Sequence, residues 1–561
     1  MVIFERLDRD LGPNSVLEFT YATNKRLETG ELIALGIVHK NMPIVKRLFF
    51  ERYTRRKPEA DLFYRTIKTY WPKFINEQQR VASHNIPEFV KNEFENYLNC
   101  GIPENGFVRT YCYTCRLTGI VAFSCKQRGF CPSCCARRMN DEAAHLVDNV
   151  LPRVKYRQWV LSFPYKLRYL MAYNSSLTNS ILSIYVKEIS KFYKRKYKAT
   201  AYKKISFKEL KSGSVTFIQR FGSALNFNAH FHTLFADGVF IKQASGDYSF
   251  HALNELDPDD LHQITERIRI KVNKILNKLD LDESQLDFSD NTEDQLLNQI
   301  SKASIGNKIQ RHGDFNSSNV ASLNLDPYSF NNEGFSLNAK VVISGCDTKK
   351  LEKLIRYMSR GPIATKRLTE FYPNGLLYEL KTPWRDGTTH VSFTPLEFIS
   401  RLVALIPPPG LNMIRYHGVF APNFKDRELV VIKSPPKSEN TAKGKAPLIA
   451  VVAHQKNVFY EEQLKRKQKR ERMRWSDILK RTFEIDVTTC FVCKGRVEQI
   501  AAIKDKTAAK AILKSLNETS ILKPIKLDED RGPPPHVQLF SEFFDESDSR
   551  EYSQETMWSE V

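Results

Sequence analysis

The chain has 561 residues, of which 42% are hydrophobic, and this length predicts a globular protein of about three or four domains. Its 85 lysines and arginines exceed its 64 aspartates and glutamates, and the formal net charge of +21 favours a polyanionic partner such as nucleic acid or a membrane surface. The N-terminal stretch MVIFERLDRD is charged, and apolar runs such as APLIAVVA at 446–453 are far shorter than a membrane span of about 20 residues. We therefore expect a cytoplasmic protein that binds nucleic acid rather than a membrane.

The N-terminal part of the chain divides into a leader and a cysteine-rich block. Residues 1–85 form the leader, which we expect to be partly helical because an amphipathic pattern begins after Arg55. Residues 86–150 form the block, with helical patterns at 87–98 and 139–151. Seven of the ten cysteines lie between Cys100 and Cys135, with spacings typical of a metal site, so we expect reduced thiols rather than disulfides.

The central part, residues 151–432, mixes strand-like and helical segments, which predicts one α+β domain. The strand candidates are RQWVLSF, GSVTFIQRF, NAHFHTLFADGVFI, GLLYEL and THVSF, and a clear helical pattern is DDLHQITERIRIKVNKILNKL. Residues 280–332 are rich in Asp, Asn and Ser, which predicts a surface insertion or a disordered loop. Residues 433–480 then form a polar linker and a basic helix, and residues 481–561 a C-terminal segment and tail.

Two C-x-x-C pairs give the strongest local signal. Cys112 and Cys115 form one pair, Cys131 and Cys134 form the other, and the interval between them fits one tetrahedral zinc site made of four thiolates. Zinc bound there would supply folding energy to a segment with little core of its own. Cys100 and Cys125 are further candidates for a second ion or a shared cluster, whereas Cys135 is expected to pack as a small apolar residue.

A third C-x-x-C pair, Cys490 and Cys493 in TTCFVCKGR, supplies only half of a tetrahedral site. No further cysteine follows it in the chain. Its candidate partners are His536, a second chain, or residues that fold back from elsewhere, so we expect either a second zinc site or an unoccupied pair of thiols.

Two histidines lie one residue apart in the strand-like stretch NFNAHFHTLFADGVF. Side chains alternate along a strand, so the aromatic residues beginning at Phe227 share one face, while His230 and His232 share the other. Two neutral imidazoles held side by side can bind one divalent ion and leave coordination positions open. The alternative to metal binding is a pair of ordinary cross-strand polar residues. Asp237 is a weak candidate for a third ligand because strict alternation places it on the opposite face unless a bulge intervenes.

A helix in DTKKLEKLIRYMSRGPIATKRL carries the tyrosine of interest. Asp347 is the expected N-cap, and the residues with helical apolar spacing are Leu351, Leu354, Ile355 and Met358. Tyr357 lies roughly 110° from the centre of that apolar stripe, so it is not placed as a core residue. Arg356 and Arg360 flank it and are candidates for holding a phosphate near its hydroxyl; the alternative is an amphipathic surface tyrosine.

Together a tyrosine, a metal ion and arginines make a set suited to transesterification, in which the phenolic oxygen attacks a phosphate and one DNA end leaves as a hydroxyl. The basic, aromatic stretch KEISKFYKRKYKATAYKK, which contains Lys194, Arg195 and Lys196, is our candidate for binding the DNA backbone. Its alternative is an exposed amphipathic helix.

At these motifs the sequence resembles the rolling-circle insertion-sequence transposases of the common-region (ISCR) and IS91-like group. The resemblance begins in the cysteine block and continues, in the family's order, through NFNAHFHTLFADGVF, LIRYMSRGPIATKRL, LVALIPPPGLNMIRYHGVFAPN and WSDILKRTFEIDVTTCFVCKGR. It covers most of the chain, from about Arg55 to Ala502.

The resemblance implies an HUH nuclease, named for a His–hydrophobic–His pair that here is His230, Phe231 and His232. Such domains have an antiparallel sheet with the histidines on a central strand and a nucleophilic tyrosine, by resemblance Tyr357, on a facing helix. The implied activity is nicking and strand transfer of single-stranded DNA at element ends, with Mg²⁺ or Mn²⁺ as the metal. The implied setting is a bacterial cytoplasm, at the nucleoid.

One feature departs from the better-known members, which carry two tyrosines four residues apart on this helix. Here the position four residues before Tyr357 is Lys353, so the chain resembles the single-tyrosine branch. One tyrosine must then act twice, or a second subunit of a homo-oligomer must supply its own. Two alternatives remain: a plasmid replication initiator or relaxase with the same chemistry, and a zinc-dependent DNA-binding protein whose nuclease centre is inactive.

Overall fold

The computed structural model of the chain describes residues 57–82, 86–172, 174–201, 205–253, 255–278, 310–313, 328–371, 375–384, 386–431, 473–483 and 485–519, together with a few positions between 296 and 304. It also describes a short antiparallel pair, β1 (Phe19–Thr20) and β2 (Arg26–Leu27). The predicted linker at 433–445, most of the basic run at 461–475, and His536 lie outside the described residues. Among the described residues, no helix combines the length and apolar character that crossing a membrane requires.

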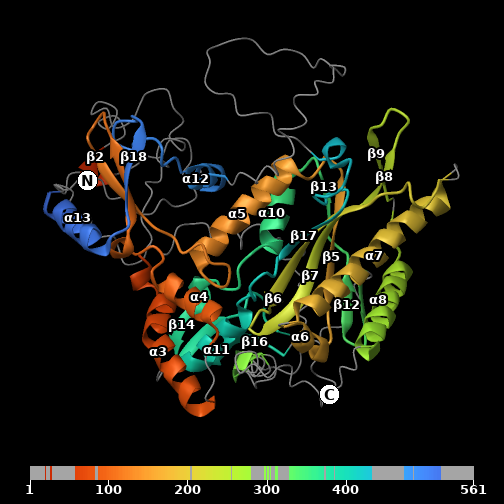
Figure 1. Cartoon of the computed structure of the whole chain (residues 1–561), viewed down its shortest axis with the longest axis horizontal. Helices are drawn as coiled ribbons and strands as arrows, with labels where there is room; N and C mark the ends of the chain where they lie inside the picture. The colour runs from red at the N-terminus through yellow and green to blue at the C-terminus, as the bar shows by residue number, and fades with distance from the viewer. Residues whose placement is uncertain are drawn as a thin grey trace, which may run out of the picture.

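A seven-stranded antiparallel sheet forms the centre of the molecule (Figure 1). Its strand order is β11-β12-β5-β7-β6-β17, and β13 also pairs with β5. The strands are β5 (Lys155–Ser162), β6 (Gly213–Phe221), β7 (Phe227–Ala236), β11 (Ser329–Asn332), β12 (Phe335–Asn338), β13 (Val342–Ser344) and β17 (Ile414–Gly418). Helices combined with antiparallel strands confirm the predicted α+β class, and the histidine-bearing strand β7 is central, with β5 and β6 on its two sides.

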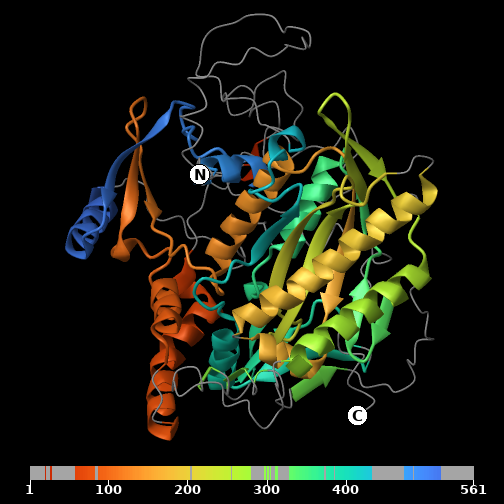
Figure 2. The ribbon, with the colours of Figure 1, turned by 45° about the vertical axis from the view of Figure 1, so that its right-hand side comes forward.

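Helices cover both faces of this sheet (Figures 1 and 2). One face packs against α7 (Ser175–Thr200) and α8 (Pro258–Lys278), with α6 (Tyr165–Met171) nearby, through side chains such as Trp159, Phe231 and Phe235. The other face packs against α5 (Pro132–Asn149) and α10 (Thr348–Met358) through Tyr156, Phe217 and Leu234. Two cores therefore sandwich the sheet, and the helical patterns predicted at 139–151 and 259–279 are helices in the structure.

A second sheet lies beside this core and packs against three helices. Its order is β10 (Gln310–Gly313), β16 (Thr388–Phe393), β15 (Gly375–Glu379) and β14 (Leu368–Phe371). The helices are α3 (Leu62–Ala82), α4 (Glu88–Leu98) and α11 (Pro395–Leu405). The rings of Trp71 and Phe94 stack with centroids 3.9 Å apart, and Phe63 packs against Phe130 and Phe398. The amphipathic helix predicted after Arg55 is thus α3, and its apolar face belongs to the same core as the cysteine block.

A third sheet joins distant parts of the chain. Strand β18 (Val497–Ile503) pairs with β3 (Phe107–Cys112), which pairs with β4 (Thr118–Ala122). Helix α13 (Lys506–Thr519) follows β18, and α12 (Trp475–Phe483) packs on α5, where Arg481 forms ion pairs with Asp148 and Glu352. The remaining elements are the hairpin β8 (Gly238–Lys242) and β9 (Tyr248–Ala252) and the 3₁₀ turns η1 (Pro58–Ala60), η2 (Pro103–Asn105), η4 (Thr365–Arg367) and η5 (Arg427–Leu429). The C-terminal segment, which the sequence set apart, therefore completes the cysteine-rich sheet.

The predicted insertion at 280–332 is partly wrong. Strands β10 and β11 lie within it and pair with β16 and β12. Leu296, Leu297 and Ile300 are buried in the main core at a helical spacing. The many Asp, Asn and Ser residues around them hid this short apolar face, so composition alone suggested a loop.

Candidate active site and zinc centres

The two histidines lie side by side on β7, facing α10. His230 is 6% exposed and His232 is 5% exposed, and their ring centroids are 4.8 Å apart. In the ladder, His232 lies between Val160 of β5 and Phe217 of β6. Strand alternation places both histidines away from the aromatic face, as expected. The sequence did not indicate that this second face would be covered too.

Hydrogen bonds to the Nδ1 atom of each ring bear on which ring nitrogen can bind a metal ion. The Nδ1 of His230 lies 2.9 Å from the carbonyl oxygen of Asn228, and because a carbonyl only accepts, Nδ1 carries the hydrogen and Nε2 keeps a lone pair. The Nδ1 of His232 lies 2.9 Å from the side-chain amide nitrogen of Gln158 on β5, so in this orientation of the amide Nδ1 accepts. With the amide turned so that its oxygen faces the ring, Nδ1 donates and Nε2 keeps the lone pair that a cation needs. Burial, followed by His230 and Arg360, holds the pKa of His232 well below its usual value. A neutral imidazole is the form that can bind a cation, so the pair has suitable donors for one divalent ion.

Helix α10 places Tyr357 over these rings. Its N-cap is Asp347, whose Oδ1 accepts from the backbone N–H of Lys350 at 3.0 Å, and the predicted apolar stripe is buried. Tyr357 lies half-buried in the last turn, with its ring 5.8 Å from that of His232 and nearly perpendicular to it. Gln219 of β6, the ladder neighbour of His230, donates to the carbonyls of Met358 at 2.8 Å and Tyr357 at 3.3 Å. A polar side chain beside the histidine pair therefore anchors the end of the tyrosine helix.

Two cations lie over the Tyr357 ring. The guanidinium carbon of Arg360 is 5.1 Å from the ring centroid, and Nζ of Lys381 is 5.2 Å from it. Arg356 instead points towards α5, where its Nη1 donates to Asn140 Oδ1 at 3.5 Å. The sequence selected Arg356 and Arg360 together, but only Arg360 contacts the tyrosine ring. Lys381 was missed because it follows β15 and reaches Tyr357 through tertiary folding alone.

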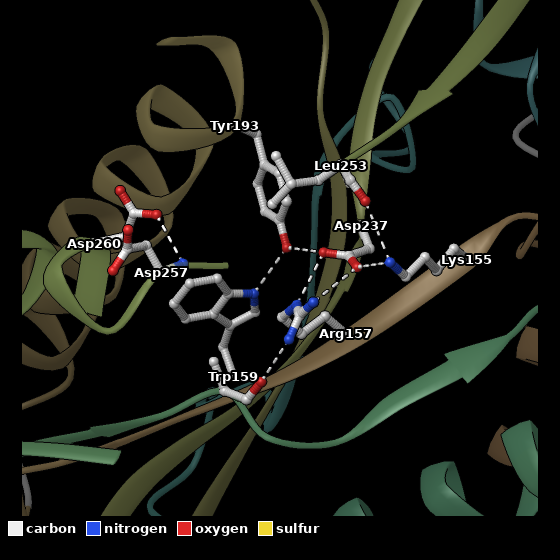
Figure 3. Close-up of polar contacts among 9 residues, drawn as sticks. Lys155, Arg157, Trp159, Tyr193, Asp237, Leu253, Asp257 and Asp260 are labelled. Atoms are coloured by element: carbon white, nitrogen blue, oxygen red, sulfur yellow. Dashed lines mark hydrogen bonds and ion pairs between the residues drawn. The ribbon is translucent and has the colours of Figure 1, made fainter. Parts of the chain in front are cut away.

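The suggestion that Asp237 is a third metal ligand is wrong (Figure 3). This carboxylate is fully buried on the opposite side of the sheet, beside α7. Arg157 donates to both of its oxygens, at 3.0 and 3.2 Å, and Lys155 lies 3.2 Å from Oδ2. Tyr193 donates to Oδ1 at 2.9 Å and accepts from the indole N–H of Trp159 at 3.0 Å. Because no bulge moves Asp237 to the histidine face, it serves as a buried counter-ion.

In the part of the chain that the structure describes, the histidine pair does not belong to a cluster of three or more His, Cys, Asp or Glu ligands. The ligand atoms of three or more such residues come close together at only two places among the described residues, and both are made of cysteines. The polar neighbours of the pair are instead the amides of Gln158 and Gln219. A divalent ion held by the pair would therefore retain positions for water and phosphate oxygens.

The cysteines form two clusters of four, and neither is the set of Cys112, Cys115, Cys131 and Cys134 that the sequence grouped in one site. Cys131 and Cys134 join the other two candidates, Cys100 and Cys125. Cys112 and Cys115 join the late pair, Cys490 and Cys493. The fifteen-residue interval fits one site locally, but the pairing of β18 with β3 brings the C-terminal thiols closer to the first pair. This corrects the predicted grouping and gives the late pair its partners.

Both clusters fit zinc. Sulfur pairs in the first lie 3.4 to 3.8 Å apart, and pairs in the second lie 3.4 and 3.5 Å apart. Four thiolates at about 2.3 Å from a tetrahedral ion are separated by about 3.8 Å. Backbone N–H groups also point at sulfur, as from Lys126 to Cys134 at 3.3 Å and from Gly495 to Cys493 at 3.4 Å, which stabilises thiolates. Cys135 lies outside both clusters, and burial raises the pKa of its thiol to about 12.

Residues 187–200 of the basic stretch proposed for the DNA backbone lie on α7, which covers the sheet face opposite Tyr357. Lys196 forms an ion pair with Asp260 at 2.8 Å, and Lys194 lies 5.3 Å from the ring of Phe207. Arg195 is exposed, and its Nε donates to the backbone of Lys191. The structure does not bring these residues to the tyrosine, so a role in DNA binding stays a prediction.

Two known protein families match this chain, one over the cysteine-rich part and one over the histidine pair and Tyr357. A transposase zinc-binding domain of the IS91 type matches residues 66–163, and the transposase family Y2_Tnp matches residues 213–428. The chain belongs to the IS91-like transposases. The first match spans the Cys100 cluster, and the second spans the histidine pair and Tyr357, whereas Cys490 and Cys493 lie outside both. No curated protein and no solved structure matches the chain.

Membership gives this IS91-like transposase a general role. It is a DNA-processing enzyme of an insertion sequence, it binds DNA, and its cysteine clusters support structural Zn²⁺. The zinc-binding match begins at residue 66, inside α3, so the family domain includes a helix that the sequence analysis assigned to the leader.

Proposed function

We propose that this transposase nicks and rejoins single-stranded DNA at the ends of its element through a covalent phosphotyrosine on Tyr357, by rolling-circle chemistry of the HUH type. The observation that carries the proposal is the position of the Tyr357 ring, 5.8 Å from that of His232, over the buried histidine pair. The hydroxyl of a tyrosine on a rigid helix, beside metal-binding nitrogens and cations, has the surroundings that a phosphoryl-transfer nucleophile requires.

Each residue then has a separate task. The phenolic oxygen of Tyr357 bonds to phosphorus, one backbone P–O bond breaks, the phenolic proton is released, and the departing strand end leaves as a hydroxyl. His230 and His232 would hold Mg²⁺ or Mn²⁺, and the ion would polarise the scissile phosphate. Arg360 and Lys381 offer positive charge to the phosphate beside the ring. Rejoining reverses the same exchange, with a strand hydroxyl displacing the tyrosine.

A single tyrosine constrains the reaction cycle. Lys353 occupies the position one turn before Tyr357, and burial lowers its pKa. The chain therefore offers no second hydroxyl there, and completing strand transfer requires Tyr357 to act twice or a second subunit to supply its own tyrosine.

The test is the formation of a covalent adduct. Purified protein is incubated with Mn²⁺ and end-labelled single-stranded DNA from the ends of the element, and adducts are resolved on a denaturing gel. We expect wild type to form an adduct and Tyr357→Phe to form none. Tyr416→Phe is the matched control, because Tyr416 is another half-buried tyrosine packed against the same core, and it should retain the adduct.

Two outcomes would count against the proposal. An adduct that persists in Tyr357→Phe would assign the nucleophile to another residue. A wild-type protein that binds the DNA without forming an adduct on any end sequence would favour the DNA-binding protein with an inactive centre.

A further inference from the structure

The second cysteine cluster is a ribbon built from two equivalent turns. We call these turns knuckles: CYTCR at 112–116 and CFVCK at 490–494. In each knuckle the first cysteine donates its backbone N–H to the carbonyl five residues on, from Cys112 to Leu117 and from Cys490 to Gly495. The basic residue after the second cysteine adopts the same left-handed conformation in both, with φ 60° at Arg116 and at Lys494. Two segments far apart in the sequence, at 112–116 and 490–494, thus supply matching halves of one site.

The tips of the knuckles expose apolar side chains. Tyr113 is 65% exposed and Val492 is 60% exposed, and they are the most exposed large apolar residues in the described part of the chain. Phe491 is 44% exposed. The ring of Tyr111 packs edge-on against Tyr113 with centroids 5.0 Å apart, which holds Tyr113 in place. Tyr113, Phe491 and Val492 are each next to a cluster cysteine in the sequence. A zinc ion held by the four thiolates would therefore fix both aromatic rings around a single centre.

Positive charge surrounds the tips. Arg116 and Lys494 are exposed at equivalent positions, and Arg496 is also exposed, with an ion pair to Glu498 at 3.3 Å. Aromatic faces set among arginine and lysine are the combination that binds single-stranded nucleic acid, because rings stack on bases while cations contact phosphates. The other cluster differs in this respect, since three of its four cysteines are buried and it packs into the main core.

We infer that the knuckle tips of the Cys112–Cys115–Cys490–Cys493 ribbon form a base-stacking platform for single-stranded DNA, with Tyr113 and Phe491 as the stacking rings. The choice of a single strand rests on the proposed function, because the substrate of nicking must present unpaired bases. A duplex would offer its phosphates to Arg116 and Lys494 but no base faces to the rings. The ribbon thereby gives the distant C-terminal pair of cysteines a part in substrate binding.

The test measures binding without cleavage. In the full-length Tyr357→Phe protein, fluorescence anisotropy gives the Kd for a labelled single-stranded oligonucleotide from the element end and for the matching duplex. Replacing both rings, Tyr113→Ala with Phe491→Ala, is expected to weaken single-strand binding by roughly 10-fold or more. Duplex binding should change by less than about 3-fold.

Three controls make the result specific. Tyr113→Phe keeps a stacking ring and should retain the wild-type Kd. Phe371→Ala removes an exposed phenylalanine on β14, away from the ribbon, and should have no effect. Two zinc ions per chain in the double variant would establish that both clusters still form.

Unchanged single-strand affinity in the zinc-loaded double variant would overturn the inference, as would an equal loss for single strand and duplex. If the double variant instead converted an oligomer into a monomer with the same DNA affinity, the tips would be a contact for a second copy of this chain, and the platform would be rejected. None of these outcomes depends on adduct formation, so they are separate from a failure of the nicking chemistry.

Discussion

On the sheet face covered by α5 and α10, the polar side chains gather around His230, His232 and Tyr357, and the ring of Tyr357 stays half-buried. On the face covered by α7 and α8, Asp237 is fully buried and surrounded by Arg157, Lys155 and Tyr193. The two groups lie on the same strands, separated only by the alternation of side chains. One face brings two imidazoles and a tyrosine together, whereas on the other the carboxylate is taken up by internal partners.

This difference predicts that the histidine face serves the reaction and that the Asp237 face serves the stability of the fold. A carboxylate that already binds two cations and a hydroxyl holds the fold together and has little to offer a metal ion. The two imidazoles lie side by side beneath a tyrosine ring, so removing them should alter the reaction more than the fold. Variants on the two faces can test this division directly.

The largest effect is expected on the histidine face. Replacing both rings, His230→Ala with His232→Ala, removes the divalent-ion donors and should reduce Mn²⁺-dependent adduct formation by about 1,000-fold or more, since metal activation of a phosphate contributes several kcal/mol. The measurement is the initial rate of adduct formation at saturating DNA. His251→Ala, at a half-buried histidine on β9, is the control and should keep the rate. A double variant with the wild-type rate would remove the pair from the mechanism.

The next effect concerns the opposite face and falls on stability. Asp237→Asn keeps the shape of the side chain but leaves Arg157 and Lys155 without their buried counter-charge, and it should cost about 3–5 kcal/mol in the free energy of unfolding. Urea denaturation measures this loss. Asp247→Asn, on the exposed turn between β8 and β9, should change stability by less than about 0.5 kcal/mol. A stable Asp237→Asn protein that loses only metal-dependent activity would contradict the structural role.

These two faces also show what local sequence could predict. Periodicity placed the histidines on one side of a strand and identified the N-cap and apolar stripe of α10, because those features depend on neighbours within a few residues. It did not reveal Lys381 or Gln219, which reach Tyr357 only when β6 and the turn after β15 come together in three dimensions. Alternation also gave the correct face for Asp237 and weakened its candidacy as a ligand.

The cysteines show the same limit more sharply. The spacing of Cys112, Cys115, Cys131 and Cys134 fits one zinc site, yet in the structure each pair lies with two other cysteines. Spacing describes only the loop between two pairs, whereas the ligands are set by which strands pair. The partner of β3 is β18, almost four hundred residues later in the chain, and no local pattern records that pairing.

A smaller effect should distinguish a side chain that orients His232 from a side chain that positions Tyr357. Gln158→Met removes the hydrogen bond to Nδ1 of His232 and should weaken the apparent Mn²⁺ affinity by about 10- to 100-fold, with the rate recovering at high Mn²⁺. Gln219→Met instead removes the bonds that anchor the end of α10, so its rate should fall without recovery at high Mn²⁺. Mn²⁺ titrations of adduct formation distinguish the two. Identical titration curves would show that the amides do not act on different groups.

The last effect is a pH dependence on the Asp237 face. Burial, followed by the charge of Arg415, lowers the pKa of His417 to about 4, and its Nε2 lies 3.1 Å from the hydroxyl of Thr216. In the unfolded chain the pKa returns to about 6.5, so the unfolded state binds more protons than the folded state between these values. Folding is therefore favoured above about pH 6.5, and this contribution, of order 3 kcal/mol, is lost as the pH falls towards 4.

Comparing the free energy of unfolding of wild type and His417→Gln at pH 7 and pH 5 tests this assignment. The glutamine variant cannot titrate, so its stability should decline less on acidification than that of wild type. Since His232 on the other face is also buried with a lowered pKa, some pH dependence should persist in the variant. An unchanged pH dependence would assign the acid sensitivity to groups other than His417.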